Sequence, residues 1–395
     1  MLIGVVGKAN VGKSTFFKAL TLAEVEIANY PFATIKPNHG VSFVKIKCVD
    51  KEFNVQCNPR EGYCTEGWRF IPVELIDVAG LVPGAHLGKG MGNQFLDDLN
   101  QADCLIHVID CSGETNEKGE VIEPGTYDPI EDIKFLETEL DMWYLRLIKK
   151  GWEVFARKVQ QEHADVNKAL AKHLAGVRVT EKLMENTIKK IGLDSNITRW
   201  DDKVLLELAS ELRKKTKPMI IACNKIDIPE AQENFERLKK RFEEYMLVPC
   251  SADFELALKE AAKRNLIKYI PGDNEFGITG DLNEKQKKAL DLIKKVLNKY
   301  NSTGVQDIIN KAVFELLKYI AVFPGGVGKL QDQNGRYIPD CFLLPEGSTA
   351  LDFAFRIHTD LGNNFIRAVD VRTKKIIGKE YKLKNRDVVE IITSK

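Results

Sequence analysis

The stretch that decides the fold is Gly7-Lys8-Ala9-Asn10-Val11-Gly12-Lys13-Ser14, which fits the pattern GxxxxGKS. An apolar run, Leu2–Val6, precedes it, and a helix-like segment follows it. A strand, a glycine-bearing loop and a helix N-terminus together surround one concavity with backbone N–H groups suited to phosphate. We expect Lys13 to reach the β- and γ-phosphates and the Ser14 hydroxyl to bind Mg²⁺. The predicted nucleotide contacts here are Gly7, Lys8, Ala9, Asn10, Val11, Gly12, Lys13, Ser14 and Thr15.

Composition excludes several classes of protein. The chain has 395 residues, which is room for two or three domains, and its 58 basic and 57 acidic residues nearly cancel. Any nucleic-acid partner must therefore be met by a local patch. The apolar strand begins at the second residue, which leaves no space for a signal peptide, and no apolar run is long enough to cross a bilayer. We expect a cytoplasmic, monomeric protein without membrane contact.

The eight cysteines include no CxxC pair, which favours reduced cysteines of a cytosolic protein. Cys57 and Cys64 lie in an irregular connection between Asp50 and Trp68. A metal site there would need two further ligands, which the sequence does not identify.

Two further phosphate signals follow. The loop Tyr30–Gly40 is punctuated by prolines, and Thr34 within it is the candidate to coordinate Mg²⁺ when a γ-phosphate is present. The alternative is a plain connecting turn. Next, Asp77-Val78-Ala79-Gly80 follows a predicted strand, so Asp77 would hold Mg²⁺ through water and the Gly80 N–H would sense the γ-phosphate.

The glycine-rich segment after Gly80 bears on catalysis. Leu81 stands where small signalling GTPases place a water-orienting Gln, so intrinsic turnover should be slow. His86 is the nearest side chain able to position a water, although a solvated loop histidine is the commoner interpretation. The predicted catalytic residues are Lys13, Thr34, Gly80 and His86.

Base recognition is predicted from Asn224-Lys225-Ile226-Asp227, an NKxD pattern after the apolar run 218–223. The Asp227 carboxylate can accept two hydrogen bonds from guanine N1–H and N2–H₂, a pattern that adenine cannot supply. Ser251 and Ala252 end a later strand, and we expect the Ala252 N–H to donate to guanine O6.

More residues separate Asp110 from Pro218 than one crossover helix needs, and their periodicity is helical. Residues 141–217 hold 17 Lys/Arg against 11 Asp/Glu, which suits an arm that touches RNA, although a solvated surface is the commoner cause of such a surplus. After further helices, a glycine-rich stretch predicts a linker before a small mixed α/β domain; it is Pro324-Gly325-Gly326-Val327-Gly328. The predicted domains are a doubly wound α/β nucleotide-binding domain (1–127 and 218–322), a helical, coiled-coil-like insertion (128–217) and a C-terminal domain (323–395).

Taken together, the chain resembles the Obg-related GTPases, closest to the YchF/Obg-like group. The matching residues are Gly7–Ser14, the loop with Thr34–Asn38, the segment Asp77–Val82, the helical insertion before NKxD, and Pro345-Glu346-Gly347-Ser348-Thr349-Ala350. The resemblance implies a C-terminal TGS domain with a ubiquitin-like β-grasp fold and association with ribosomes. It also implies K⁺ as an added charge near Asn10, although Ala9 replaces a proline common in the group.

The predicted function is a Mg²⁺-dependent, slow, partner-stimulated GTPase that cycles between GTP and GDP as a switch linked to translation. Many YchF relatives have NxxE in place of NKxD and use ATP, so a YchF-type ATPase is one alternative. The other is a ribosome- or RNA-binding factor in which nucleotide is mainly a structural ligand.

Overall fold

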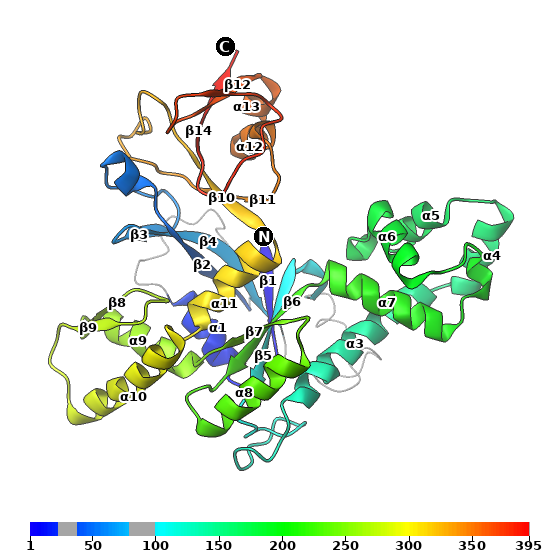
Figure 1. The fold of residues 1–395 in the computed structure, drawn as a ribbon, viewed down its shortest axis with the longest axis horizontal. Coiled ribbons are helices and arrows are strands. Elements are labelled where there is room, and N and C mark those ends of the chain that lie inside the picture. Colours follow the sequence, from blue (N-terminus) through cyan, green and yellow to red (C-terminus); the bar gives the residue numbers. More distant parts are fainter. Residues whose placement is uncertain (23–37, 79–98, 395) are drawn as a thin grey trace. The chain divides into compact units, whose positions relative to one another are not determined.

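The computed structural model describes residues 1–22, 38–78 and 99–394 (Figure 1). The chain forms two compact units: Met1–Phe17 with Leu75–Asp253, and Lys18–Glu74 with Phe254–Lys395. Three predicted functional residues, Thr34, Gly80 and His86, lie outside the described residues, as does Leu81. No described helix is long and apolar enough to cross a membrane.

A mainly parallel sheet organises the first unit. Strands β1 (Leu2–Val6), β5 (Cys104–Asp110), β6 (Met219–Asn224) and β7 (Met246–Pro249) pair in parallel in that order. These strands are continuous apolar runs because both faces of a parallel sheet are covered, and every residue of β5 and β6 is buried. Strand β4 (Trp68–Asp77) continues the sheet, and the full order is β2-β4-β1-β5-β6-β7. Helix α1 (Lys13–Thr21) follows β1, α8 (Pro229–Arg241) contacts β6 and β7, and α9 (Ala252–Lys263) follows β7.

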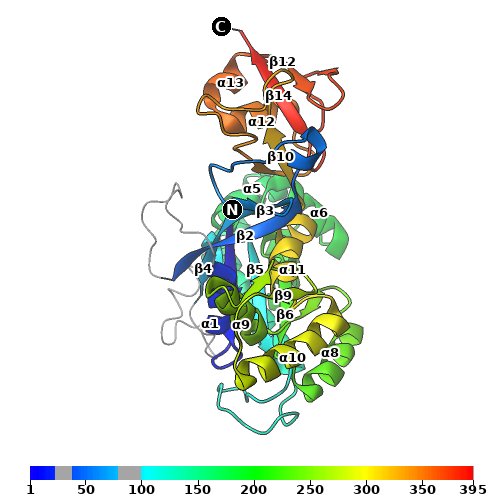
Figure 2. The same ribbon diagram turned by 90° about the vertical axis from the view of Figure 1, so that its left-hand side faces the viewer.

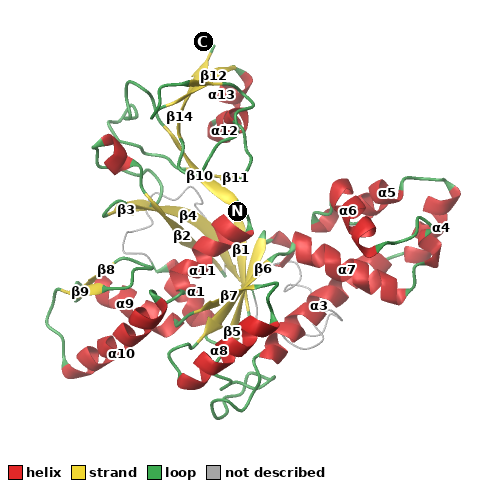
Figure 3. Cartoon of the chain, in the orientation of Figure 1, coloured by secondary structure: helices red, strands yellow, loops and turns green. Residues whose placement is uncertain are grey.

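The insertion before β6 is entirely helical, as the red ribbon of Figure 3 shows from α3 to α7. Helices α3 and α7 pack along each other, and the Arg213 guanidinium of α7 bonds the Asp141 carboxylate of α3 at 2.7 Å. The stretch 154–175 contains parts of two helices, because Asp165 caps a new helix by accepting the Lys168 N–H. The helices are α3 (Ile130–Lys149), α4 (Trp152–Gln161), α5 (Val166–His173), α6 (Glu181–Ile191) and α7 (Asp202–Thr216).

The second unit contains a strand-rich part and a helical part. Strand β3 pairs antiparallel with β4, and a short 3₁₀ turn at Asp50–Phe53 follows β2. Helix α10 begins with a capping box in which Asn283 and Gln286 exchange hydrogen bonds. The elements are β2 (His39–Lys47), β3 (Tyr63–Thr65), the hairpin β8 (Ile267–Tyr269) and β9 (Phe276–Ile278), α10 (Glu284–Tyr300) and α11 (Val305–Lys311).

The C-terminal residues form a five-stranded sheet of order β11-β10-β14-β12-β13 with helices α12 and α13 against it (Figure 2). Strand β10 is parallel to β14, whereas the other pairs are antiparallel. Residues Tyr319–Pro324 form β10, a run rich in aromatic and branched residues that suit a strand. Thr349 caps α12. The elements are β10, β11 (Phe342–Pro345), α12 (Ala350–Ile357), α13 (Thr359–Asn363), β12 (Phe365–Asp370), β13 (Ile376–Ile377) and β14 (Val388–Thr393).

Candidate nucleotide-binding site

The GxxxxGKS stretch forms the loop between β1 and α1, and Lys13 is the first residue of α1. Gly12 has φ +87°, a left-handed conformation that favours glycine. A Cβ at this position would also lie 2.3 Å from the Asn224 side-chain nitrogen. The second glycine of the motif is therefore required both by backbone conformation and by the close approach of the NKxD segment.

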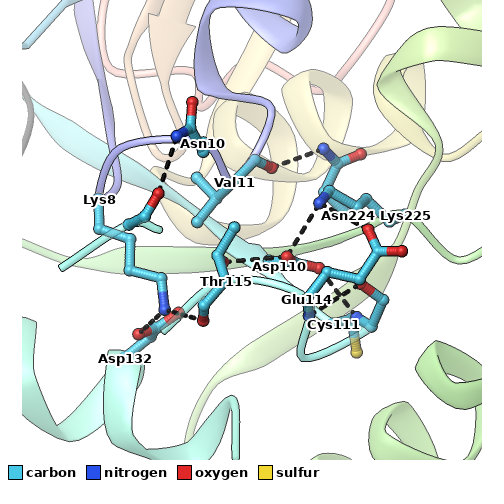
Figure 4. Close-up of polar contacts among 12 residues, drawn as sticks. Lys8, Asn10, Val11, Asp110, Cys111, Glu114, Thr115, Asp132, Asn224 and Lys225 are labelled. Carbon is cyan, nitrogen blue, oxygen red and sulfur yellow. Dashed lines mark hydrogen bonds and ion pairs between the residues drawn. The ribbon is translucent and has the colours of Figure 1, made fainter. Parts of the chain in front are cut away.

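Asn224, at the end of β6, connects two sequence motifs (Figure 4). Its Nδ2 donates to the backbone oxygen of Val11 at 2.9 Å, and its Oδ1 accepts the N–H of Ala252 at 3.0 Å. The carboxyl ends of parallel strands meet at one edge of the sheet, which is where ligands bind in doubly wound folds. One buried amide thus holds the phosphate-loop residues against the Ser251-Ala252 segment.

This geometry changes the role predicted for Ala252. The sequence analysis assigned the Ala252 N–H to guanine O6, but in the structure that N–H already donates to Asn224. The geometry therefore does not support Ala252 as a free donor to the base. Asp227, in contrast, makes no hydrogen bond with another described residue and is half-buried, so its carboxylate is available to a ligand.

Lys13 forms an ion pair with Asp77 across the loop. Both side chains are largely buried, with 11% and 22% of their areas exposed. Lys13 is the predicted phosphate ligand and Asp77 the predicted Mg²⁺ ligand, so each satisfies the other's charge here. Ser14, the second residue of α1, is exposed, and its hydroxyl is a hard oxygen donor of the type that Mg²⁺ prefers.

Residues 111–127 follow β5 and contact the phosphate loop (Figure 4). The sequence analysis did not identify this segment. The Asn10 Nδ2 donates to the Gly119 carbonyl at 2.8 Å, and the Lys8 Nζ donates to the Thr115 carbonyl at 2.9 Å. Lys8 also pairs with Asp132 at 2.8 Å. Burial raises the pKa of Asp132 to about 6, against the opposing influence of Lys8. The Lys8 side chain is therefore engaged by the protein, and only its backbone remains for a phosphate.

Lys225 joins the same segment to the NKxD motif. Its Nζ donates to Asp110 at 2.9 Å and to Glu114 at 3.1 Å. Burial acts to lower the pKa of Lys225, but hydrogen bonds and the charges of Asp110 and Glu114 outweigh it and raise the pKa. The amine is thus firmly charged and held in place, which leaves its aliphatic stem to border a base.

His107, in the middle of β5, is a buried histidine of the core. Burial lowers its pKa to about 3, with a further contribution from the charge of Lys8. It is therefore neutral in the folded protein near neutral pH and takes no part in the site.

Several basic residues of the helical insertion pair with acidic residues of the insertion itself. Representative pairs are Lys149 with Asp202 at 2.8 Å, Lys189 with Glu185 at 2.6 Å and Lys190 with Glu211 at 2.5 Å. Such exposed pairs contribute little to stability. They favour the solvated-surface interpretation for many of these charges over a continuous patch for RNA.

The fold and the arrangement of these motifs define a P-loop nucleotide-binding protein. Family models match successive parts of the chain: "50S ribosome-binding GTPase" over residues 2–139, "Obg-like GTPase YGR210-like, G4 motif-containing domain" over 222–326, and "TGS domain" over 328–393.

Among known proteins, an uncharacterized GTP-binding protein of Methanocaldococcus jannaschii is 49% identical over 394 residues, covering 100% of this chain and 99% of its own. The ribosome-binding ATPase YchF of Buchnera aphidicola is 27% identical and covers 98% of both chains. A crystal structure of a GTP-binding protein from Pyrococcus horikoshii is 39% identical, covers 100% of both chains and superposes with a TM-score of 0.78. The chain belongs to the Obg-like GTPases, with a P-loop GTPase domain and a C-terminal TGS domain.

Proposed function

We propose that this protein binds GTP with Mg²⁺ and hydrolyses it slowly to GDP and phosphate. The observation that carries the proposal is the half-buried Asp227 carboxylate, which lacks a hydrogen-bond partner among the described residues although its neighbour Asn224 is fully engaged. A guanine N1–H and N2–H₂ pair would satisfy this carboxylate, whereas adenine offers no matching pair of donors. A polar group built to pair with one base rejects another strongly, because the wrong base leaves it unpaired.

The phosphates would replace an existing ion pair. Lys13 and Asp77 now neutralise each other. With nucleotide and metal bound, Lys13 would contact the β- and γ-phosphates, and Asp77, the Ser14 hydroxyl and Thr34 would hold Mg²⁺. The ion would supply charge stabilisation during phosphoryl transfer. Thr34 and the Gly80 N–H report the γ-phosphate in this proposal, and His86 is the candidate to orient water.

K⁺ is a further candidate ligand of the site. The Asn10 Nδ2 is used by the Gly119 carbonyl, whereas its Oδ1 makes no hydrogen bond with a described residue and is an oxygen that can bind a cation. A cation beside the phosphates would stabilise the charge of the transition state in a site where Leu81 cannot orient a water. Asn10→Gly should then abolish stimulation by K⁺ relative to Na⁺. Equal stimulation of this variant and the wild type would remove Asn10 from the proposal.

The test of the base preference is equilibrium competition between GTP and ATP for the purified protein with Mg²⁺, first in K⁺ and then in Na⁺ buffer. Strong preference for GTP, lost in Asp227→Ala, is the expected result. Equal or better binding of ATP would replace the proposal with the YchF-type ATPase, the activity in the name of the Buchnera relative.

We propose that nucleotide state controls association with the large ribosomal subunit, because relatives and a matching family model carry ribosome-binding names. Co-sedimentation with 50S subunits should be stronger with a non-hydrolysable GTP analogue than with GDP. The competing hypothesis, in which nucleotide is a structural ligand, predicts equal sedimentation in both states and in Lys13→Ala.

A further inference from the structure

Three cysteines and one aspartate converge within the second unit. Cys48, Asp50, Cys57 and Cys64 place one ligand atom each within 4.8 Å of one another. The Cys48 and Cys57 sulfurs are 3.5 Å apart, and the Cys64 sulfur is 3.8 Å from the Asp50 Oδ2. We propose that these four side chains bind one structural Zn²⁺ ion.

The spacing fits a single tetrahedral ion. Zinc–sulfur bonds of about 2.3 Å at tetrahedral angles place ligand sulfurs about 3.8 Å apart. The Cys48–Cys57 sulfur separation of 3.5 Å lies close to that value, and all four ligand atoms lie within 4.8 Å of one another. An iron–sulfur cluster would require its cysteines to be farther apart, because each binds a different iron.

The burial of Asp50 argues against the alternative that the three cysteines are ordinary core residues without a metal. Its side chain is fully buried, and it has no salt bridge with any described residue. Its Oδ1 accepts the Lys51 N–H at 2.8 Å, and its Oδ2 faces the sulfurs while accepting the Cys57 N–H at 3.3 Å. A buried carboxylate is costly unless a positive charge compensates it, and a divalent cation among the four ligands would do so.

The surroundings suit a metal–thiolate group. Three thiolates and a carboxylate exceed the charge of Zn²⁺, and Arg69 pairs in register with Cys64 across the β3–β4 ladder, so its positive charge is close by. The Arg69 guanidinium is itself buried and fixed by the carbonyls of Ile338 and Pro339 at 3.2 and 2.8 Å. Cys64 is only partly buried, which offers the ion a route from solvent.

A bound ion would cross-link the irregular segment after β2, which contacts the C-terminal residues of the same unit. Arg386 donates to the Lys47 carbonyl at 2.9 Å and to the Cys48 carbonyl, and Arg372 pairs with Glu52 at 2.7 Å. The four protein ligands would fill the tetrahedral coordination shell of the ion and leave no position for water or substrate. The site is therefore structural rather than catalytic. Each cysteine that binds loses its thiol proton to the buffer as its sulfur–zinc bond forms.

The test is metal analysis of the full-length protein, purified without chelators or affinity metals. Elemental analysis by mass spectrometry should find about one zinc ion per chain. Replacement by Co²⁺ should give the charge-transfer and intense visible bands of tetrahedral thiolate coordination. Cys57→Ser and Cys64→Ser should each lose most of the metal, and Asp50→Asn should weaken its binding.

Cys341→Ser is the matched control, because Cys341 lies in the same unit and is not one of the four ligands. It should retain zinc and the cobalt spectrum. Wild-type protein without zinc and without cobalt bands would overturn the proposal, even if the cysteine variants fail to fold. So would full zinc content in both Cys57→Ser and Cys64→Ser, or an intact mass lower by a pair of hydrogens, which would reveal a disulfide instead.

Discussion

The Asn224 side-chain nitrogen and the Val11 carbonyl oxygen lie 2.9 Å apart although 213 residues separate them in the chain. Asn224 also accepts the Ala252 N–H. The phosphate loop and the base-recognition segments are therefore held together before any nucleotide binds, which reduces the ordering cost of binding.

Asn224→Ala should lower both stability and nucleotide affinity. It leaves the Val11 oxygen and the Ala252 N–H without partners in a buried place, at a cost of about 1–3 kcal/mol for each group. Thermal unfolding and GTP titration measure the two effects. Asn234→Ala is the control, since Asn234 also donates to a backbone carbonyl, that of Cys111 at 3.0 Å, but does not join the motifs. Equal GTP affinity in the two variants would contradict the assigned role.

Asp227→Asn should reduce GTP affinity by roughly 100-fold or more, because the amide replaces an acceptor with a donor that faces the guanine N–H groups. ATP affinity should change little, and affinity for xanthosine triphosphate should rise, since its C2 oxygen accepts from the new amide. Competition binding among GTP, ATP and xanthosine triphosphate measures these changes in affinity. Asp253→Asn, an exposed neighbour, should leave the order of preference unchanged.

The ion pair between Lys13 and Asp77 predicts two different defects. Lys13→Gln should lose most nucleotide affinity with or without Mg²⁺, because the lysine contacts phosphate. Asp77→Asn should keep the affinity measured in a chelator but lose the gain from Mg²⁺. Titrations in the two buffers separate the variants. Identical profiles would show that the residues do not divide the phosphate and metal roles.

Gly119→Ala should disturb the phosphate loop. A Cβ at Gly119 would lie 2.8 Å from the Ala9 Cβ and 2.9 Å from the Ala9 oxygen. Gly125→Ala is a close control: the φ angles are +78° and +75°, but a Cβ at Gly125 meets only the Glu230 side chain at 3.6 Å. Both variants carry the backbone strain of about 1 kcal/mol. Only Gly119→Ala should weaken GTP binding, by about tenfold, and equal binding by both would show that the 111–127 segment does not support the loop.

His107 predicts acid sensitivity. Its pKa is about 3 in the folded protein against 6.5 ordinarily, so the unfolded chain binds an extra proton between these values. Stability is therefore fully present above about pH 6.5 and falls as the pH drops toward 3, at up to 1.4 kcal/mol per pH unit. His107→Leu should flatten this part of a stability profile measured by denaturant unfolding. An unchanged slope would mean that other groups dominate.

The motifs of the candidate nucleotide site could be recognised in the sequence because their signals are local. GxxxxGKS and NKxD each place backbone and side chains within one turn, and the strands before them are short apolar runs. The contacts of Lys8 with Thr115 and of Asn10 with Gly119 were not predictable, because nothing in residues 111–127 resembles a motif. Similarly, β10 has an apolar pattern that continues from a helix, and only its pairing with β11 and β14 makes it a strand.

The sequence by itself determined the class of protein, its family and the presence of a C-terminal TGS domain, because these depend on motifs whose residues are neighbours in the chain. Only the tertiary structure decided which partners distant side chains take. In the structure the Ala252 N–H donates to Asn224, so it is not a free donor to a nucleotide base. The tertiary structure also brought Cys48 and Asp50 to Cys57 and Cys64, the two ligands that the sequence could not supply. Ligand sets of this kind arise when separate strands and turns pack together, and spacing along the chain does not encode that packing.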